Sequence, residues 1–167
     1  MTPTMEQAKL MTSEGFKLEV RRVIRAPRAR VFEAWTNPER IQQWFGGGVR
    51  RVQSAATEPH VGGAYRIEME RSCDDLAKAG QPNQTSEPAS IAIGNYTEIV
   101  TDKKLVFTWN GSWNPTETTL VTIELADVAE GTELKLTHER FLTVESKNGH
   151  EQGWTNNVAS LAAFCEA

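Results

Sequence analysis

The 167-residue chain has the length of one domain and is long enough to bury a substantial core. Its net charge of −4 and its pI of about 5.5 argue against binding to nucleic acid or to an anionic membrane, because both require a clustered positive surface. No run approaches the roughly 20 apolar residues of a membrane-spanning helix, and the N-terminus lacks the apolar run of a signal peptide, so we expect a cytoplasmic protein with no membrane span. Residues 1–15 are polar and aperiodic and are expected to form a flexible tail to a single domain over residues 16–167.

The first predicted elements are a strand and two short helices. Alternating apolar and charged positions predict a half-buried strand over residues 16–24. Pro27 and Pro38 each suit the first position of a helix, where the missing N–H costs nothing, and Asn37 can cap the second helix. Both helices carry an apolar stripe, and glycines at 46–48 end the second one.

The rest of the chain predicts a sheet followed by one long helix. Residues 72–89 have no period and are rich in turn-forming residues, which indicates a long exposed hairpin loop. From about Gly149 the apolar positions take a helical period, and the stripe must pack against one face of the sheet. Short turns between neighbouring strands favour antiparallel pairing. The further predicted strands cover residues 49–56, 64–71, 91–100, 104–110, 118–126 and 133–141.

Five segments in this order carry a resemblance to a known family. They are VIRAPRARVFEAWTNPERIQQWF at residues 23–45, VGGAYRIEM at 61–69, GNYTEIVTDKKLVFTWN at 94–110, TELKLTHERF at 132–141 and GHEQGWTNNVASL at 149–161. The chain resembles the START-like (Bet v 1-like, SRPBCC) superfamily, and more closely the stand-alone bacterial proteins related to the Hsp90 ATPase activator homologue.

The resemblance implies an α+β helix-grip fold over almost the whole chain. In this fold a seven-stranded antiparallel sheet wraps around a long C-terminal helix, and two short helices after strand 1 close one end. Many relatives carry Trp-Trp-Gly-Pro where this chain has Trp44-Phe45-Gly46-Gly47, which places the difference at the mouth of the expected pocket.

The sequence contains no motif for a metal site, a phosphate-binding loop or a nucleophile. His60, His138 and His150 lie far apart in the sequence and outside any HExxH pattern. Cys73 and Cys165 are outside any CxxC pattern and are expected to be free thiols. We therefore expect no cofactor and no bound metal.

His138 is the most informative single residue. It continues the inward alternation of Leu134 and Leu136, so its imidazole should point toward the helix, where an apolar lining would favour the neutral form. It could bind a ligand or transfer a proton. It could equally be a core histidine whose nitrogens are satisfied by the backbone or by a side chain such as Asn157.

The remaining candidates are aromatic and acidic residues on the predicted strands and helices. Tyr65 and Glu68 lie on opposite faces of one strand, and Tyr96 and Glu98 pose the same choice on the next. An inward carboxylate would be costly without a partner and would therefore indicate function. The aromatic residues are expected to converge around the groove between helix and sheet. The candidate ligand-binding set is Trp44, Phe45, Tyr65, Glu68, Tyr96, Trp109, Trp113, His138, Trp154 and Asn157.

Three functional hypotheses follow. The first is binding of a hydrophobic small molecule in an internal cavity between helix and sheet, by a monomer or a homodimer. The second, which the resemblance implies, is a polyketide cyclase/aromatase-like enzyme that would use His138 with Glu68 or Tyr96. The third is a chaperone-associated stress-response role, implied by the family name alone. We favour the first, because no catalytic constellation stands out.

Overall fold

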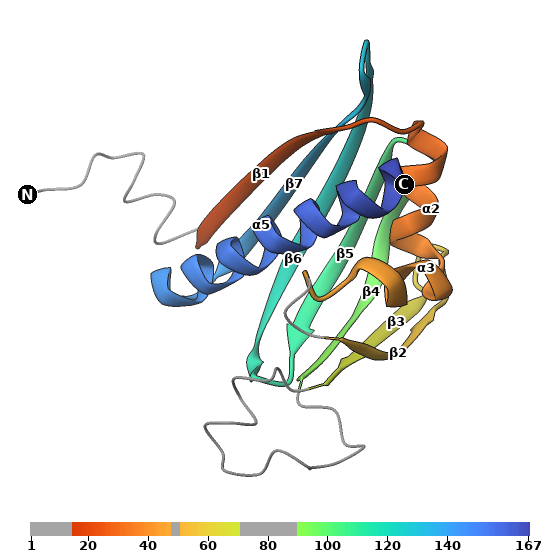
Figure 1. Cartoon of the computed structure of the whole chain (residues 1–167). Coiled ribbons are helices and arrows are strands. Elements are labelled where there is room, and N and C mark those ends of the chain that lie inside the picture. The colour runs from red at the N-terminus through yellow and green to blue at the C-terminus, as the bar shows by residue number, and fades with distance from the viewer. Residues whose placement is uncertain (1–14, 48–50, 71–89) are drawn as a thin grey trace, which may run out of the picture.

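The computed structural model describes residues 15–47, 51–70 and 90–167, in which one antiparallel sheet curves around the C-terminal helix (Figure 1). The sheet order is β1-β7-β6-β5-β4-β3-β2, so that each strand from β2 to β7 lies beside its neighbour in sequence. The strands are β1 (Phe16–Ile24), β2 (Val52–Thr57), β3 (Ala64–Met69), β4 (Ser90–Val100), β5 (Lys104–Gly111), β6 (Asn114–Val128) and β7 (Gly131–Phe141). The helices are α2 (Arg28–Thr36), α3 (Pro38–Trp44) and α5 (Val144–Glu166).

The predicted helix-grip fold is confirmed. The seven strands, the two short helices after β1 and the long C-terminal helix all occur in the expected order. The tail expected over residues 1–15, except for its last residue, and the loop expected over residues 72–89 lie outside the described residues, as does Cys73. No helix in the described ranges is long and apolar enough to cross a membrane.

Helix α3 begins where the sequence places its cap, whereas α2 begins one residue after Pro27, the residue predicted to occupy its first position. Pro27 is the N-cap residue of α2, one position before the first helical residue, with φ −64° and ψ 151°. The Asn37 side chain accepts a hydrogen bond of 2.9 Å from the Glu39 N–H, and Pro38 occupies the first turn of α3. The Asn37 cap and Pro38 thus fix where α3 begins.

Helix α5 is longer than its apolar period indicates, since it begins at Val144 and not near Gly149. Thr143 caps it by accepting a hydrogen bond of 3.1 Å from the Ser146 N–H. Apart from the exposed Val144, the first two turns are built from polar residues and Gly149, so they carry no apolar stripe. At the other end, Arg30 donates to the Cys165 carbonyl oxygen at 3.1 Å and ties α5 to α2.

A buried carboxylate from the sheet also holds the start of α5. Glu117 of β6 is buried, and its two carboxylate oxygens accept hydrogen bonds from the Leu142 N–H at 2.8 Å and from the Ser146 hydroxyl at 2.6 Å. A negative charge at a helix N-terminus also interacts favourably with the helix dipole. The sheet therefore fixes where α5 enters the groove.

Replacing Glu117 with alanine is expected to lower the free energy of unfolding by about 2 kcal/mol, because two charge-assisted hydrogen bonds to the start of α5 are lost. Urea denaturation of the purified variant measures the change. Glu130→Ala, at an exposed position in the β6–β7 turn, is the matched control and should shift stability by less than about 0.5 kcal/mol. Equal effects of the two substitutions would contradict this role of Glu117.

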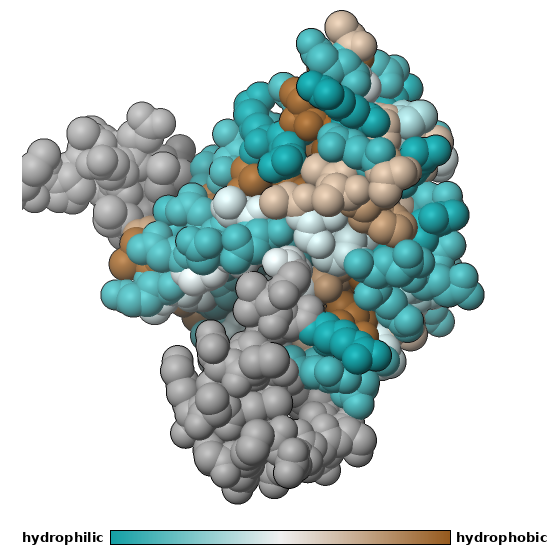
Figure 2. Space-filling view, in the orientation of Figure 1, coloured by the Kyte–Doolittle hydropathy of each residue, from teal (hydrophilic) through white to brown (hydrophobic). Residues whose placement is uncertain are grey.

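The core lies between the concave face of the sheet and α5, and polar residues cover most of the described surface seen in Figure 2. Apolar residues of every described strand and helix contribute to one continuous cluster. The α5 stripe predicted from the sequence is buried in this cluster, as its four residues Trp154, Val158, Leu161 and Cys165 show. This packing places the aromatic side chains discussed next.

Candidate functional site

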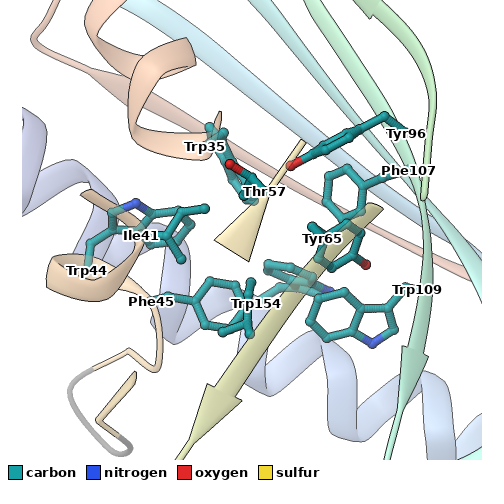
Figure 3. Close-up of a pocket in the computed structure, with 11 residues that line it drawn as sticks. Trp35, Ile41, Trp44, Phe45, Thr57, Tyr65, Tyr96, Phe107, Trp109 and Trp154 are labelled. Carbon is teal, nitrogen blue, oxygen red and sulfur yellow. The ribbon is translucent and has the colours of Figure 1, made fainter. Parts of the chain in front are cut away.

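An aromatic-lined inner cavity lies between the two short helices, the sheet and α5. Side chains from α2, α3, β2, β3, β4, β5 and α5 converge on it (Figure 3). Its volume is about 20 Å³. The residues lining this inner cavity are Trp35, Ile41, Trp44, Phe45, Thr57, Tyr65, Ile67, Tyr96, Phe107, Trp109 and Trp154.

The inner cavity lies where the sequence led us to expect an internal pocket, and it is small. A volume of this size holds about one water molecule. The rings themselves fill the space, since Trp35 packs edge-on against Trp44 with ring centroids 4.8 Å apart and Tyr65 packs edge-on against Phe107 at 5.3 Å. An internal cavity between helix and sheet is therefore present, but its aromatic lining nearly fills it.

A larger outer hollow lies at the end of the sheet where α5 begins. Its volume is about 680 Å³, and it opens between the β5–β6 hairpin, the end of α3 and the first half of α5. The residues lining this outer hollow are Phe45, Gly46, Met69, Ser90, Trp109, Trp113, Asn114, Thr143, Glu145, Ser146, Gly149, His150, Gln152, Gly153, Trp154, Asn156 and Asn157. The hollow thus combines an aromatic wall with a polar rim.

Three aromatic rings separate the two spaces. Phe45, Trp109 and Trp154 line both the inner cavity and the outer hollow. Their ring centroids are 6.2 Å apart for Phe45 and Trp109, 6.0 Å for Phe45 and Trp154, and 5.1 Å for Trp109 and Trp154. We call these three side chains the aromatic partition.

Trp113 forms the exposed edge of the outer hollow. It occupies the two-residue turn of the β5–β6 hairpin, and its indole lies over Gly111, where a Cβ atom would overlap the ring. The ring packs on Trp109 at 6.0 Å and on His150 at 5.8 Å, yet 47% of the residue is exposed. A large aromatic surface is thus available at the mouth of the hollow.

His138 is fully buried and both of its ring nitrogens have partners. Trp154 Nε1 donates to His138 Nδ1 at 2.8 Å, and because an indole nitrogen can only donate, Nδ1 is unprotonated. Nε2 therefore carries the proton and lies 2.6 Å from the Thr119 hydroxyl, which in turn donates to the Trp109 carbonyl oxygen at 3.2 Å. Burial, and to a smaller extent the nearby His150, lowers the pKa of His138 well below 6.5.

This arrangement decides between the two readings of His138 that the sequence left open. The imidazole faces inward as predicted, but it does not line either space, and its partners are Trp154 and Thr119 instead of Asn157. A neutral imidazole with both nitrogens bonded orients the aromatic partition. It is not a free proton acceptor.

His150 belongs to the site and was not among the candidates. Its Nε2 accepts a hydrogen bond from Trp109 Nε1 at 3.2 Å, so Nδ1 carries the proton and donates to the Ser146 carbonyl oxygen at 2.8 Å. Its ring packs edge-on against His138, with ring centroids 5.1 Å apart, and lines the outer hollow. One feature of the sequence indicates that His150 belongs to the site: it lies one turn before Trp154 on the same helix, so the two side chains share a helix face.

The structure brings most of the candidate residues together and leaves one outside. Tyr65 and Tyr96 face inward, whereas Glu68 lies on the outer face of the sheet, where Arg66 binds it at 2.7 Å and Ser54 donates to it at 3.1 Å. The hydrogen bonds from Arg66 and Ser54 lower the pKa of Glu68. Glu68 is therefore corrected to a surface residue with no part in the site.

Two other candidates, Trp44 and Asn157, line different spaces and each forms a hydrogen bond within the chain. Trp44 lines the inner cavity, but its Nε1 donates to the Ala34 carbonyl oxygen at 2.8 Å and fixes α3 against α2. Asn157 lines the outer hollow and accepts a hydrogen bond of 2.7 Å from the Gly46 N–H. Through these hydrogen bonds, Trp44 and Asn157 fix the chain segments that surround the aromatic partition.

Neither space resembles a metal site. Among the described residues, no three histidine, cysteine, aspartate or glutamate side chains gather closely enough to hold a metal ion. The described lining of the inner cavity contains no charged side chain, and Glu145 is the one carboxylate among the described residues of the outer hollow. The arrangement is suited to enclosing an apolar molecule.

Solved structures with the same fold include several bacterial proteins. Protein CV1439 from Chromobacterium violaceum is 23% identical, with a TM-score of 0.72 over 90% of this chain and 98% of that chain. The AHSA1-like protein from Aeromonas hydrophila is 16% identical, with a TM-score of 0.68 over 89% and 91%. DynU16, a protein in the dynemicin biosynthetic locus, is 20% identical, with a TM-score of 0.68 over 90% of this chain and 47% of its own.

These likenesses show the fold, and the family follows from the sequence itself. Comparison with curated proteins gave no match. The family model described as Activator of Hsp90 ATPase homolog 1-like protein matches residues 25–166, which is most of the chain and spans α2 through α5. The chain therefore belongs to the family of Activator of Hsp90 ATPase homolog 1-like proteins.

Proposed function

We propose that this protein binds an apolar, ring-containing small molecule in the outer hollow. The observation that carries the proposal is an aromatic wall of Phe45, Trp109, Trp113 and Trp154 around a space of about 680 Å³. Pockets for drug-sized ligands have volumes of about 300–1,000 Å³ and are lined mainly by apolar and aromatic side chains with a few polar groups. The outer hollow fits this description.

The exposed indole of Trp113 supports the same proposal. Trp109 and His150 hold its ring in place, so it would lose little conformational freedom when a ligand covers it. Aromatic rings gain about 0.5–1.5 kcal/mol from stacking beyond the area they bury. A flat ring system placed against Trp113 would bury the largest exposed aromatic surface among the described residues.

The contacts favour binding over acid–base catalysis. A general base needs a free lone pair directed at the substrate, and a general acid needs a proton that it can release. In His138 and His150 the unprotonated nitrogen accepts from a tryptophan and the protonated nitrogen faces Thr119 or Ser146. We therefore rank a cyclase-like enzyme below a binding protein.

Binding is tested by isothermal titration with naringenin, a flavonoid, and with decanoate, a fatty acid. We expect naringenin to bind and Trp113→Ala to weaken it about tenfold, which corresponds to about 1.4 kcal/mol of lost ring contact. Val61→Ala removes an exposed apolar side chain from the β2–β3 turn, away from the hollow, and should leave the affinity unchanged. Failure of naringenin to bind, whether or not decanoate binds, or the same affinity in Trp113→Ala as in the wild type, would contradict the proposal.

A further inference from the structure

We propose that the inner cavity takes a neutral hydrogen-bond-accepting oxygen, such as a ketone or quinone carbonyl, of the ligand whose apolar body lies in the outer hollow. This inference rests on the proposed function and names the chemical class of its ligand. It is carried by two hydrogen-bond donors, on residues that line the inner cavity, for which the described residues supply no acceptor.

The first of these groups is the indole N–H of Trp35. Trp35 is 5% exposed and lines the inner cavity, and its Nε1 has no hydrogen-bond partner among the described residues. An indole nitrogen can only donate a hydrogen bond, so a buried one without an acceptor is left with an uncompensated loss of hydration. Such groups are rare in native proteins and call for an explanation.

The other buried tryptophans show that this fold normally supplies an acceptor. Trp44 Nε1 donates to the Ala34 carbonyl oxygen, Trp109 Nε1 to His150 and Trp154 Nε1 to His138, at 2.8, 3.2 and 2.8 Å respectively. All three line the same inner cavity as Trp35. Trp35, on α2, is therefore the one of these four tryptophans whose indole N–H has no acceptor among the described residues.

The second group is the hydroxyl of Tyr96. Tyr96 is buried, and its hydroxyl donates no hydrogen bond to the described residues, whereas the hydroxyl of the neighbouring Tyr65 donates to the Thr108 carbonyl oxygen. In Figure 3 the Tyr96 hydroxyl is directed toward the side of the cavity that holds Trp35 and Thr57. Burial raises the pKa of Tyr96, so the hydroxyl keeps its proton at neutral pH and can donate it.

The chemistry of these groups selects the kind of atom that the inner cavity accepts. The Trp35 N–H and the Tyr96 O–H are both donors, and the Thr57 hydroxyl already donates to the Thr36 carbonyl oxygen at 2.7 Å. A carbonyl oxygen, with two lone pairs, can accept from both donors. A carboxylate would lack a counter-charge, because no described lining residue of the inner cavity is basic.

The volume selects how much of the ligand enters. A space of about 20 Å³ admits one water-sized group, so the oxygen occupies the inner cavity and the rings of the ligand remain beyond the aromatic partition. Passage requires the ring of Phe45 to move aside. Phe45 is the C-cap residue of α3 and precedes Gly46 and Gly47, both of which have positive φ, so its ring is not held by a continuing helix.

The test compares two ligands of similar shape that differ in the acceptor. The affinities of 2-acetylnaphthalene, a ketone, and of 2-ethylnaphthalene, the corresponding hydrocarbon, are measured by titration with the wild type and with Trp35→Phe and Tyr96→Phe. Each substitution removes one donor and keeps an aromatic ring. We expect each to weaken ketone binding about five- to twentyfold and to change hydrocarbon binding by less than about twofold.

Tyr65→Phe is the matched control, because it removes a hydroxyl from the same cavity wall that is already bonded to Thr108. It should leave the ketone-to-hydrocarbon ratio of affinities unchanged, even if both affinities fall together. An equal ratio in the wild type, Trp35→Phe and Tyr96→Phe overturns the inference while the proposed function stands, and is the result expected if the two donors serve only a bound water. Absence of binding by both naphthalenes overturns the inference, and it overturns the proposed function as well if naringenin also fails to bind.

Discussion

Replacing Gly94 with alanine is expected to lower the free energy of unfolding by about 3 kcal/mol or more, a large effect for a single methyl group. A Cβ atom at Gly94 in β4 would overlap the carbonyl oxygen of Thr108 in β5 and come within 2.7 Å of the Tyr65 hydroxyl. That hydroxyl crosses β4 at the glycine to donate to the same Thr108 oxygen. Relief of the overlap requires the two strands to separate and breaks the hydrogen bond, and urea denaturation measures the cost.

Two other glycines provide an internal control for this prediction. Gly149 and Gly153 lie one turn apart in α5, and no atom of the described residues lies within 4 Å of a Cβ added to either. Because alanine is favoured over glycine in a helix by about 1 kcal/mol, Gly149→Ala and Gly153→Ala should each stabilise the protein by about 0.5–1 kcal/mol. A Gly94→Ala variant that unfolds at the same urea concentration as the wild type would show that β4 and β5 are not packed as described.

Acid is expected to destabilise the protein through His138, by up to about 1.4 kcal/mol per pH unit as the pH falls below about 6.5. The pKa of His138 in the folded protein lies well below 6.5, because burial and the nearby His150 disfavour the imidazolium. Above about pH 6.5 both the folded and the unfolded states are neutral at this residue. Below about pH 6.5, His138 binds a proton in the unfolded state but not in the folded state, until the pH reaches the pKa of His138 in the folded protein.

The contribution of His138 is isolated by a variant that cannot titrate. His138→Gln should be less stable than the wild type at pH 7.5 by about 2–4 kcal/mol, because it disturbs the acceptor for Trp154 and the partner of Thr119. Its stability should then change less than that of the wild type between pH 7.5 and pH 5.5, as measured by urea denaturation at each pH. Equal slopes for the two proteins would show that His138 does not resist protonation.

The sequence predicted the order and type of the elements because their signals are local. Alternation along the strands and the Asn37-Pro38 cap depend on neighbouring residues, and both are found where expected. The start of α5 was placed too late, because Gly149 and the polar first turns hide the helical period. The hydrogen bonds that fix this start come from Thr143 and from the distant Glu117, whose partnership only the folded chain reveals.

The site was predictable in its residue types and not in its volume. Alternation placed His138 on the inward face, which the structure confirms, but it left open whether Tyr65 and Tyr96 or their acidic neighbours face inward, and the structure buries both tyrosines. It could not show that His138 pairs with Trp154, or that His150 pairs with Trp109 from 41 residues away. The free space depends on how the rings interlock, and a list of inward aromatic residues is compatible with a cavity or with a filled core.

Binding of a small molecule at the aromatic partition would be seen in the indole N–H signals of ¹⁵N-labelled protein during titration with 2-acetylnaphthalene. The five tryptophans give five signals. We predict the largest shifts for Trp113, at the mouth of the outer hollow, and for Trp35, whose N–H gains an acceptor, and the smallest for Trp44, whose N–H stays bonded to Ala34. Signals that do not move at saturating ligand, or a shift confined to Trp44, would contradict it.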